Sequence, residues 1–143
     1  MIVPMREDHI AQVAALEKLC FSDPWSEASI SAELHNPLST WLVCEEDGVV
    51  TGYIGAQAVP PEADLMNLAV SPDCRRQGVG AKLLFSMTEL LHRQGIETLF
   101  LEVRPSNTAA IALYEAFDFV QVGRRPKYYV NPPEDALDRK SVV

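Results

Sequence analysis

The segment from Asn67 to Gly80 constrains the fold of this chain more than any other feature. A strand over 64–70 runs into a loop that contains Pro72, and a helix begins near Val79 with glycines at 78 and 80. Glycine permits a tight turn and a close approach of the backbone to a ligand. The first N–H groups of a helix lack helical partners, and the helix dipole favours an anion there. We therefore expect residues 76–81 to form a cradle for a diphosphate, made of Arg76, Gln77, Gly78, Val79, Gly80 and Ala81.

Two better-known phosphate-binding motifs do not fit this loop. A Walker loop needs the pattern GxxxxGK[ST], which the chain lacks, and the dinucleotide fingerprint GxGxxG would need glycine where Leu83 stands. A lone Gly-x-Gly is a weak signal, because a loop can need two glycines for turn geometry alone. From this pattern by itself, both interpretations stay open.

Hydrophobic spacing, caps and turn residues predict the other elements. Their order predicts a mixed α/β (α+β) fold, with one central β-sheet and about four flanking helices. The expected elements are helices over His9–Cys20 (capped by Asp8) and from Ser26 to His35, strands over Thr40–Glu45, Val49–Val59 and Asp64–Val70, a helix from Val79 that ends before Gly95, the strand Thr98–Val103, a helix over Asn107–Phe117 capped by Ser106, and strands over Phe119–Val122 and Tyr128–Val130.

Length and charge narrow the class of protein. The chain has 143 residues, which predicts a single domain over 1–143. Twelve Lys and Arg against twenty Asp and Glu leave a net charge of −8, which disfavours direct nucleic-acid binding. The three cysteines are scattered and the three histidines lack metal-ligand spacing, so we expect neither disulfides nor a metal. Without a signal peptide or a membrane-length apolar run, we expect a cytoplasmic protein.

The loop and its surroundings resemble a known family. The run Arg75-Arg76-Gln77-Gly78-Val79-Gly80 after Leu68-Ala69-Val70 is similar to the [QR]-x-x-G-x-[GA] signature of the Gcn5-related N-acetyltransferases (GNAT). Further segments, in order, resemble one subfamily, the bacterial ribosomal-protein-alanine N-acetyltransferases (RimI), so that the resemblance covers nearly the whole chain. These segments are Phe21–Ser26, Leu101–Asn107, Ala109–Glu115 and Gly123–Tyr129.

The resemblance implies acetyl-CoA as the cosubstrate, with its pyrophosphate at residues 76–81. It also implies that Leu68, Ala69 and Val70 hold the thioester and the pantetheine arm, and that Asn107 contacts the coenzyme. Two departures stand out. Asp118 replaces a glycine of the family pattern. Asp138-Arg139-Lys140 replaces an apolar strand, so we expect the last strand to be short, shifted or frayed.

Acyl transfer to an amine needs a proton acceptor, a donor for the leaving thiolate and a donor to the thioester oxygen. Glu102 interrupts the apolar run 99–103, where burial beside Phe100 would raise its pKa toward a useful value. The alternative is a solvated carboxylate at the end of a strand. The family's Leu-Glu-Val-Arg element places its proton acceptor at this position. A backbone N–H within 68–70 would serve the thioester oxygen if that strand bulges or diverges from its neighbour.

Tyr114 is the candidate proton donor, because its spacing from Asn107 matches the family. The alternative is a core tyrosine whose hydroxyl binds a backbone carbonyl. Aromatic residues at Phe21, Trp25, Tyr128 and Tyr129 either wall a peptide groove or form a small satellite core, and the sequence favours neither.

The resemblance implies transfer to the N-terminal alanine of a ribosomal protein. A lysine or a small amine is the alternative acceptor, and a non-enzymatic binding module is disfavoured by Glu102 and Tyr114 together. Fold alone would not decide between these functions.

Overall fold

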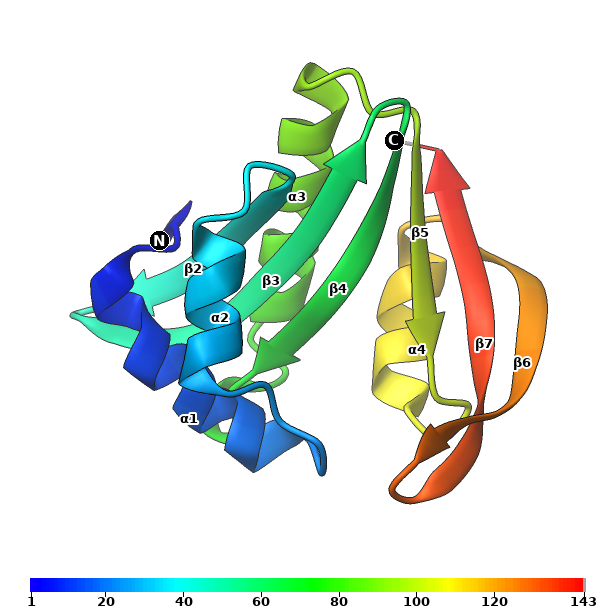
Figure 1. Cartoon of the computed structure of the whole chain (residues 1–143), viewed down its shortest axis with the longest axis horizontal. Coiled ribbons are helices and arrows are strands. Elements are labelled where there is room, and N and C mark those ends of the chain that lie inside the picture. The colour runs from blue at the N-terminus through cyan, green and yellow to red at the C-terminus, as the bar shows by residue number, and fades with distance from the viewer. Residues whose placement is uncertain (143) are drawn as a thin grey trace.

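The computed structural model describes residues 1–142, and its seven strands form one sheet in the order β1-β2-β3-β4-β5-β7-β6. Neighbouring strands are antiparallel except for β4 and β5, which are parallel (Figure 1). The elements in chain order are β1 (Ile2–Pro4), α1 (Ile10–Cys20), α2 (Glu27–Leu34), β2 (Ser39–Glu46), β3 (Val49–Val59), β4 (Glu62–Val70), α3 (Val79–Arg93), β5 (Thr98–Val103), α4 (Thr108–Ala116), β6 (Val120–Val130) and β7 (Pro133–Val142), with short 3-10 turns at Glu7–His9 and Pro72–Cys74.

The parallel pairing in the middle of the sheet is short. It joins Glu62 to Thr98 and ends where Asp64 pairs with Phe100, after which β4 and β5 separate (Figure 1). A bulge at Met66 follows, because Gly55 of β3 pairs with Asn67 while the next residue, Ala56, pairs with Leu65. Beyond Asp64, the β5 side of β4 therefore has no strand partner.

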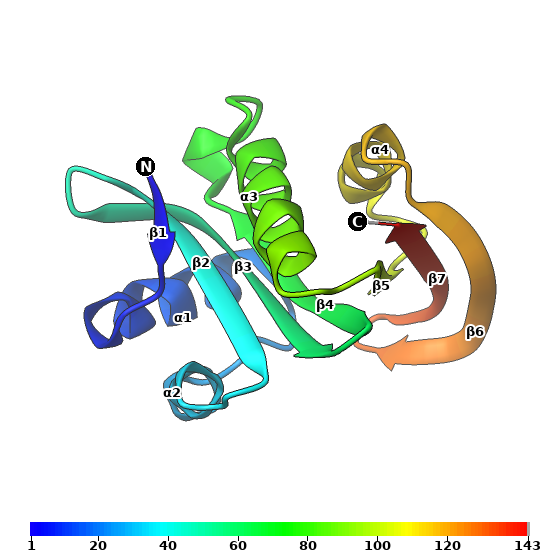
Figure 2. The ribbon, with the colours of Figure 1, turned by 90° about the horizontal axis from the view of Figure 1, so that it is seen from above.

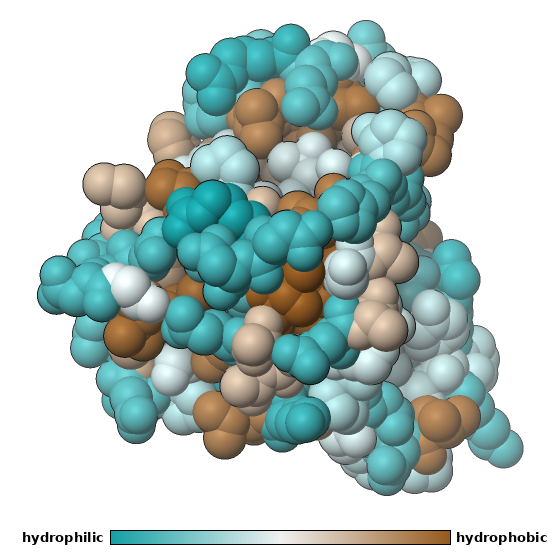
Figure 3. Space-filling model, turned by 60° about the vertical axis from the view of Figure 1, so that its left-hand side comes forward, coloured by the Kyte–Doolittle hydropathy of each residue, from teal (hydrophilic) through white to brown (hydrophobic). Residues whose placement is uncertain are grey.

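Helices cover both faces of the sheet. Figure 2 shows α3 and α4 on one face and α1 and α2 on the other. Residues 1–142 form two apolar cores. The amphipathic helix α3 buries Leu83, Leu84, Met87 and Leu91 in the first core. The helices α1 and α2 bury Val13 and Ile30 in the second core. Polar side chains predominate on the face that Figure 3 brings forward, and its apolar side chains lie in separate patches. None of the helices in residues 1–142 is long and apolar enough to span a membrane.

Most of the predicted local signals are present. The Ser26 hydroxyl accepts a hydrogen bond from the Ser29 N–H and caps α2, and Gly95 takes φ +84 just after α3. Two predicted caps are wrong. Asp8 pairs with Arg6 instead of capping α1, and Asn107 rather than Ser106 caps α4, because the Ser106 hydroxyl and N–H both donate to Glu134.

The C-terminal strands differ from the prediction. The two short strands expected over 119–130 are one strand, β6, which bends at a register shift where Lys127 has φ +53. The strand expected to fray is the ten-residue β7, between β5 and β6. Two of the charged residues expected to disturb it are ion-paired, Asp138 with Arg125 and Arg139 with Glu115. These pairs accompany the apolar packing of the buried Ala136 and Leu137 in the same strand.

Gly55 offers a test of the second core. It pairs across strands with Trp41, which is 5% exposed and stacks on Tyr53. A Cβ at position 55 would lie 2.6 Å from Cδ2 of the Trp41 ring, so the buried ring would have to move. We expect Gly55→Ala to lower the free energy of unfolding by about 1–3 kcal/mol, measured by urea denaturation.

Gly48→Asn is the matched control for this substitution. Nothing lies within 4 Å of a Cβ at position 48, and asparagine tolerates its positive φ. Equal stability losses for the two variants would contradict the close packing of Trp41 on Gly55.

Candidate active site

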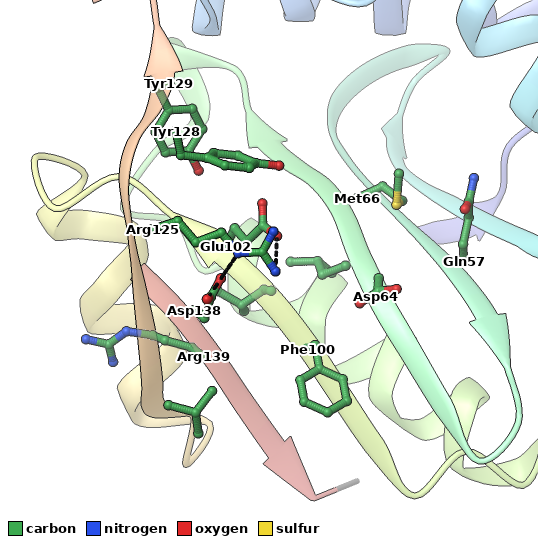
Figure 4. Close-up of a pocket in the computed structure, with 13 residues that line it drawn as sticks. Gln57, Asp64, Met66, Phe100, Glu102, Arg125, Tyr128, Tyr129, Asp138 and Arg139 are labelled. Carbon is green, nitrogen blue, oxygen red and sulfur yellow. Dashed lines mark hydrogen bonds and ion pairs between the residues drawn. The ribbon is translucent and has the colours of Figure 1, made fainter. Parts of the chain in front are cut away.

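A cavity of about 760 Å³ lies where β4 and β5 separate (Figure 4). One wall comes from β3 and β4, the floor from β5, and the other wall from β6 and β7. Its lining residues are Gln57, Asp64, Leu65, Met66, Phe100, Leu101, Glu102, Val122, Arg125, Tyr128, Tyr129, Asp138 and Arg139.

Glu102 lies in the middle of this cavity. Strand alternation buries Leu101 and Val103 in the first core and turns Phe100 and Glu102 to the opposite face. The Glu102 side chain is 31% exposed, and its Oε1 lies 3.5 Å from an Arg125 guanidinium nitrogen. The Tyr128 hydroxyl also donates to this carboxylate, and that hydrogen bond raises the pKa of Tyr128. The carboxylate is thus held by two partners yet accessible from the cavity.

The cavity wall formed by β6 carries both of the predicted tyrosines. The Tyr128 and Tyr129 rings are perpendicular with centroids 5.1 Å apart, and the Arg104 guanidinium lies 4.2 Å from the centre of the Tyr129 ring. Burial, followed by the Glu102 charge, raises the pKa of Tyr129 to about 12. Tyr129 therefore keeps its hydroxyl proton at neutral pH.

The other two predicted aromatic residues lie elsewhere. Phe21 and Trp25 do not line this cavity but pack against the second core. There the rings of Trp25 and Trp41 make an edge-to-face contact, with their centroids 5.6 Å apart. The loop that carries them does reach the far wall, because the Ser22 hydroxyl donates to the Asn131 carbonyl just after β6. This loop thus joins α1 and α2 to the turn between β6 and β7.

Tyr114 projects from α4 into the first core. It is 6% exposed, its ring packs on Phe119, and burial followed by the nearby Tyr129 raises its pKa far above neutrality. Its hydroxyl makes no hydrogen bond with any other group in residues 1–142, so the expected alternative of a backbone carbonyl partner is not found there. The side chain is thus a protonated phenol whose hydroxyl has no hydrogen-bond partner in the described part of the chain.

The loop before α3 has the geometry of an anion site. Arg76 and Gly78 take φ +65 and +78, and the first helical hydrogen bond runs from the Lys82 N–H to the Gly78 carbonyl. The N–H groups of Val79, Gly80 and Ala81 are thus left without helical partners. Nothing lies within 4 Å of a Cβ at Gly78, so the backbone is open to a ligand on that side. The residues present fit a phosphate group.

Asn107, which the resemblance implies as a coenzyme contact, also has a structural role. Its side-chain oxygen accepts the Ala110 N–H at 3.2 Å and so caps α4. Its side-chain NH2 group makes no hydrogen bond with the other residues in 1–142 and remains available as a donor.

The structure adds residues that sequence reasoning did not single out. Arg125 bridges two carboxylates, with its Nε 3.1 Å from Asp138 and a terminal nitrogen near Glu102. Asp64 lies on the opposite wall, and burial together with the Glu102 charge raises the pKa of its carboxyl. Arg125 belongs to the segment Gly123–Tyr129 that resembles the family, and Asp138 belongs to the charged C-terminal segment. Neither the resemblance nor the charge indicated that these residues line a cavity. Among the described residues, no group of His, Cys, Asp and Glu side chains is arranged to hold a metal ion.

Comparisons with known proteins identify this arrangement. The acetyltransferase (GNAT) family profile matches residues 10–119. The chain belongs to the GNAT acetyltransferase family. A putative ribosomal protein bS18-alanine N-acetyltransferase of Bacillus subtilis is 39% identical over 134 residues, which cover 93% of this chain and 89% of that protein. The corresponding Escherichia coli enzyme is 37% identical over 124 residues, which cover 85% and 83% of the two chains.

A solved structure agrees with this assignment. The crystal structure of the ribosomal-protein-S18-alanine N-acetyltransferase from Escherichia coli superposes with a TM-score of 0.92 at 32% identity, over 100% of this chain and 93% of that one. The protein is therefore an N-acetyltransferase of the GNAT fold and resembles the RimI enzymes. Enzymes of this family use acetyl-CoA, whose diphosphate suits the loop at 76–81.

Ligand-induced stabilisation tests this loop. At about 100 times its dissociation constant, a ligand adds about 2.7 kcal/mol to stability. For a domain near this size, that free energy predicts a melting-temperature rise of about 5–10 °C with acetyl-CoA, measured by differential scanning fluorimetry. Gly78→Val should largely abolish the rise, because its side chain points into the open side of the loop.

Gly78→Asn separates backbone strain from blocked access. Asparagine tolerates the positive φ that strains valine, yet it also fills the space beside the backbone. We expect it to melt near the wild type without ligand and still to lose most of the shift. An unchanged shift in both variants would remove Gly78 from the coenzyme site.

Proposed function

We propose that the protein is an N-α-acetyltransferase that moves an acetyl group from acetyl-CoA to the N-terminal alanine of a small-subunit ribosomal protein. The observation that carries the proposal is the separation of β4 from β5 after Asp64 and Phe100. The gap lies between the loop at 76–81, which fits an anion, and the cavity that contains Glu102. A coenzyme and a peptide bound at these places would meet at the break. The names of the Bacillus subtilis and Escherichia coli relatives support the acceptor.

Each step of direct transfer has a candidate group in this chain. Glu102 accepts the proton of the attacking amine, through a water molecule where the distance requires it. A backbone N–H of Leu68–Val70 donates to the thioester oxygen as negative charge develops on it. Tyr114 gives its proton to the departing coenzyme sulfur, a role that suits a hydroxyl without a hydrogen-bond partner among the described residues. The amine nitrogen gains the acetyl carbon as the carbon–sulfur bond breaks.

The free energy of deprotonation favours an α-amine as the acceptor. An α-amine has a pKa of about 7.7–8.0 and a lysine amine about 10.4, so deprotonation at pH 7 costs roughly 1 kcal/mol for the first and over 4 kcal/mol for the second. The Glu102 carboxylate, which is 31% exposed and accessible from the cavity, is assigned this easier task. The alternative acceptors are a lysine side chain or a small amine, and they would use the same coenzyme site.

The charges of the cavity suit a basic peptide. The carboxylates of Asp64, Glu102 and Asp138 line it, and Arg125 pairs with the last two, which leaves Asp64 without an ion-pair partner in the described chain. A cationic α-amine, or a basic side chain beside it, would relieve this excess of negative charge.

Glu102→Gln tests the proton acceptor. The substitution keeps the shape of the side chain but cannot accept the amine proton, so we expect turnover at neutral pH to fall about 10²–10⁴-fold while the acetyl-CoA melting shift remains. Steady-state kinetics with an N-terminal alanine peptide measure the loss. Glu89→Gln, an exposed carboxylate on α3, is the matched control. Near-wild-type turnover of Glu102→Gln at every pH would assign the proton to another acceptor.

Two peptides of one sequence test the acceptor. One has a free N-terminal alanine and an acetylated internal lysine, and the other has a blocked N-terminus and a free lysine. We expect the first peptide to react far faster in a mass-spectrometric assay, and added salt to slow it, because the cavity attracts positive charge. Faster reaction of the second peptide would replace the N-terminal acceptor with lysine and leave the coenzyme site unchanged.

A further inference from the structure

Glu17 is a buried carboxylate that the mechanism above does not use. It lies on α1, is 1% exposed, and belongs to neither the cavity lining nor the coenzyme loop. Burial raises the pKa of this carboxyl, and hydrogen bonds from Tyr53, Trp25 and Asn67 oppose the rise. A polar group buried in an apolar core is retained only where its partners are well placed, so the positions of those partners indicate its role.

Three separate elements donate hydrogen bonds to Glu17. Its Oε1 accepts from the Tyr53 hydroxyl of β3 and from the Asn67 side-chain amide of β4, and its Oε2 accepts the Trp25 N–H at 3.1 Å. Trp25 lies in the loop that reaches the turn after β6 through Ser22. One carboxylate thus connects the loop beside the proposed peptide site to the central strands.

Asn67 connects Glu17 to the backbone that is proposed to bind the thioester. It directly follows the β4 bulge, and its side-chain oxygen accepts the Leu68 N–H at 3.1 Å. Leu68 begins the segment proposed to bind the thioester. Because the pairing of β4 with β5 ends at Asp64, no strand on that side fixes the plane of the peptide between residues 67 and 68. The Asn67 side chain, held at its amide end by Glu17, supplies the missing constraint.

We propose that Glu17 is a positioning residue for acetyl transfer, which acts from α1 by orienting Asn67 and, through it, the Leu68–Val70 backbone that is proposed to polarise the thioester. This inference rests on the proposed transfer mechanism, but it does not depend on which amine is the acceptor. It differs from a stabilising role alone, because it predicts a defect in the chemical step that the melting temperature does not account for.

Three variants separate the positioning role from fold stability. Glu17→Gln replaces one acceptor oxygen by a donor and must lose a partner. Asn67→Ala removes the side chain that links Glu17 to the Leu68 N–H, and so takes one donor away from Glu17 as well. Tyr53→Phe is the matched control, since it removes a bond to the same carboxylate and keeps the bonds from Asn67 and Trp25 to Glu17. Apart from that bond, Asn67 loses only a 3.5 Å contact with the Tyr53 hydroxyl.

Single-turnover kinetics with acetyl-CoA and chloroacetyl-CoA provide the readout. We expect Glu17→Gln and Asn67→Ala to lower the acetyl-transfer rate about 10–100-fold, with little change in the KM for acetyl-CoA. The defect should shrink with chloroacetyl-CoA, because its more electrophilic carbonyl needs less polarisation. The leaving thiolate is the same in both donors, so a contribution from Tyr114 cancels in the comparison. Tyr53→Phe should keep the wild-type rate with both donors even if its melting temperature falls.

Several results would overturn the proposal. These are an equal defect with both donors, a loss in Tyr53→Phe as large as in the other variants, or rates that simply follow the melting temperatures. If Glu17→Gln does not fold, Asn67→Ala decides the question on its own. The assay uses whichever amine the wild-type protein acetylates, so a wrong acceptor assignment would be seen in the wild type and would not be mistaken for failure of the Glu17 role.

Discussion

The early end of the pairing between β4 and β5 is the constraint on which the site depends. A sheet normally continues its hydrogen bonds along the whole length of neighbouring strands. Here the bonds between β4 and β5 stop at Asp64 and Phe100, whereas β7 pairs along the whole of β5. The separation leaves Glu102 exposed to a cavity on one face, and β4 leads into the loop that begins α3. The proposed base on β5 and the proposed thioester-binding segment of β4 both follow the point where this strand pair comes apart.

Local chemistry allowed much of the fold to be predicted. The α3 periodicity with Gly95 after it, the Asp47-Gly48 turn and the strand over 98–103 are signals contained within a few residues, and all three are present. The errors arose where distant partners decide. Ser106 fails as a cap because Glu134, far along the chain, binds it, and the charged strand β7 forms because Arg125 and Glu115 pair with its side chains.

The same distinction applies to the candidate site. Glu102, Tyr128 and Tyr129 lie together in one cavity, so the structure places the two tyrosines in a groove, one of the two arrangements that the sequence left open. Phe21 and Trp25 belong instead to the opposite core, which aromatic composition alone could not reveal. Asp64 and Arg125 were missed for a related reason. A single charged residue on a strand is common in any sequence. Its part in a site becomes visible only when the fold shows which side chains it faces across the cavity.

The contact between Gly55 and the Trp41 ring has a consequence for how such chains diverge. Because the indole fills the space that a side chain at 55 would occupy, neither position can change freely while the other stays fixed. A relative with a bulky residue at 55 needs a smaller one at 41, and one that keeps the tryptophan must keep the glycine. Substitutions at the two sites are therefore expected to be coupled, although thirteen residues of chain lie between them.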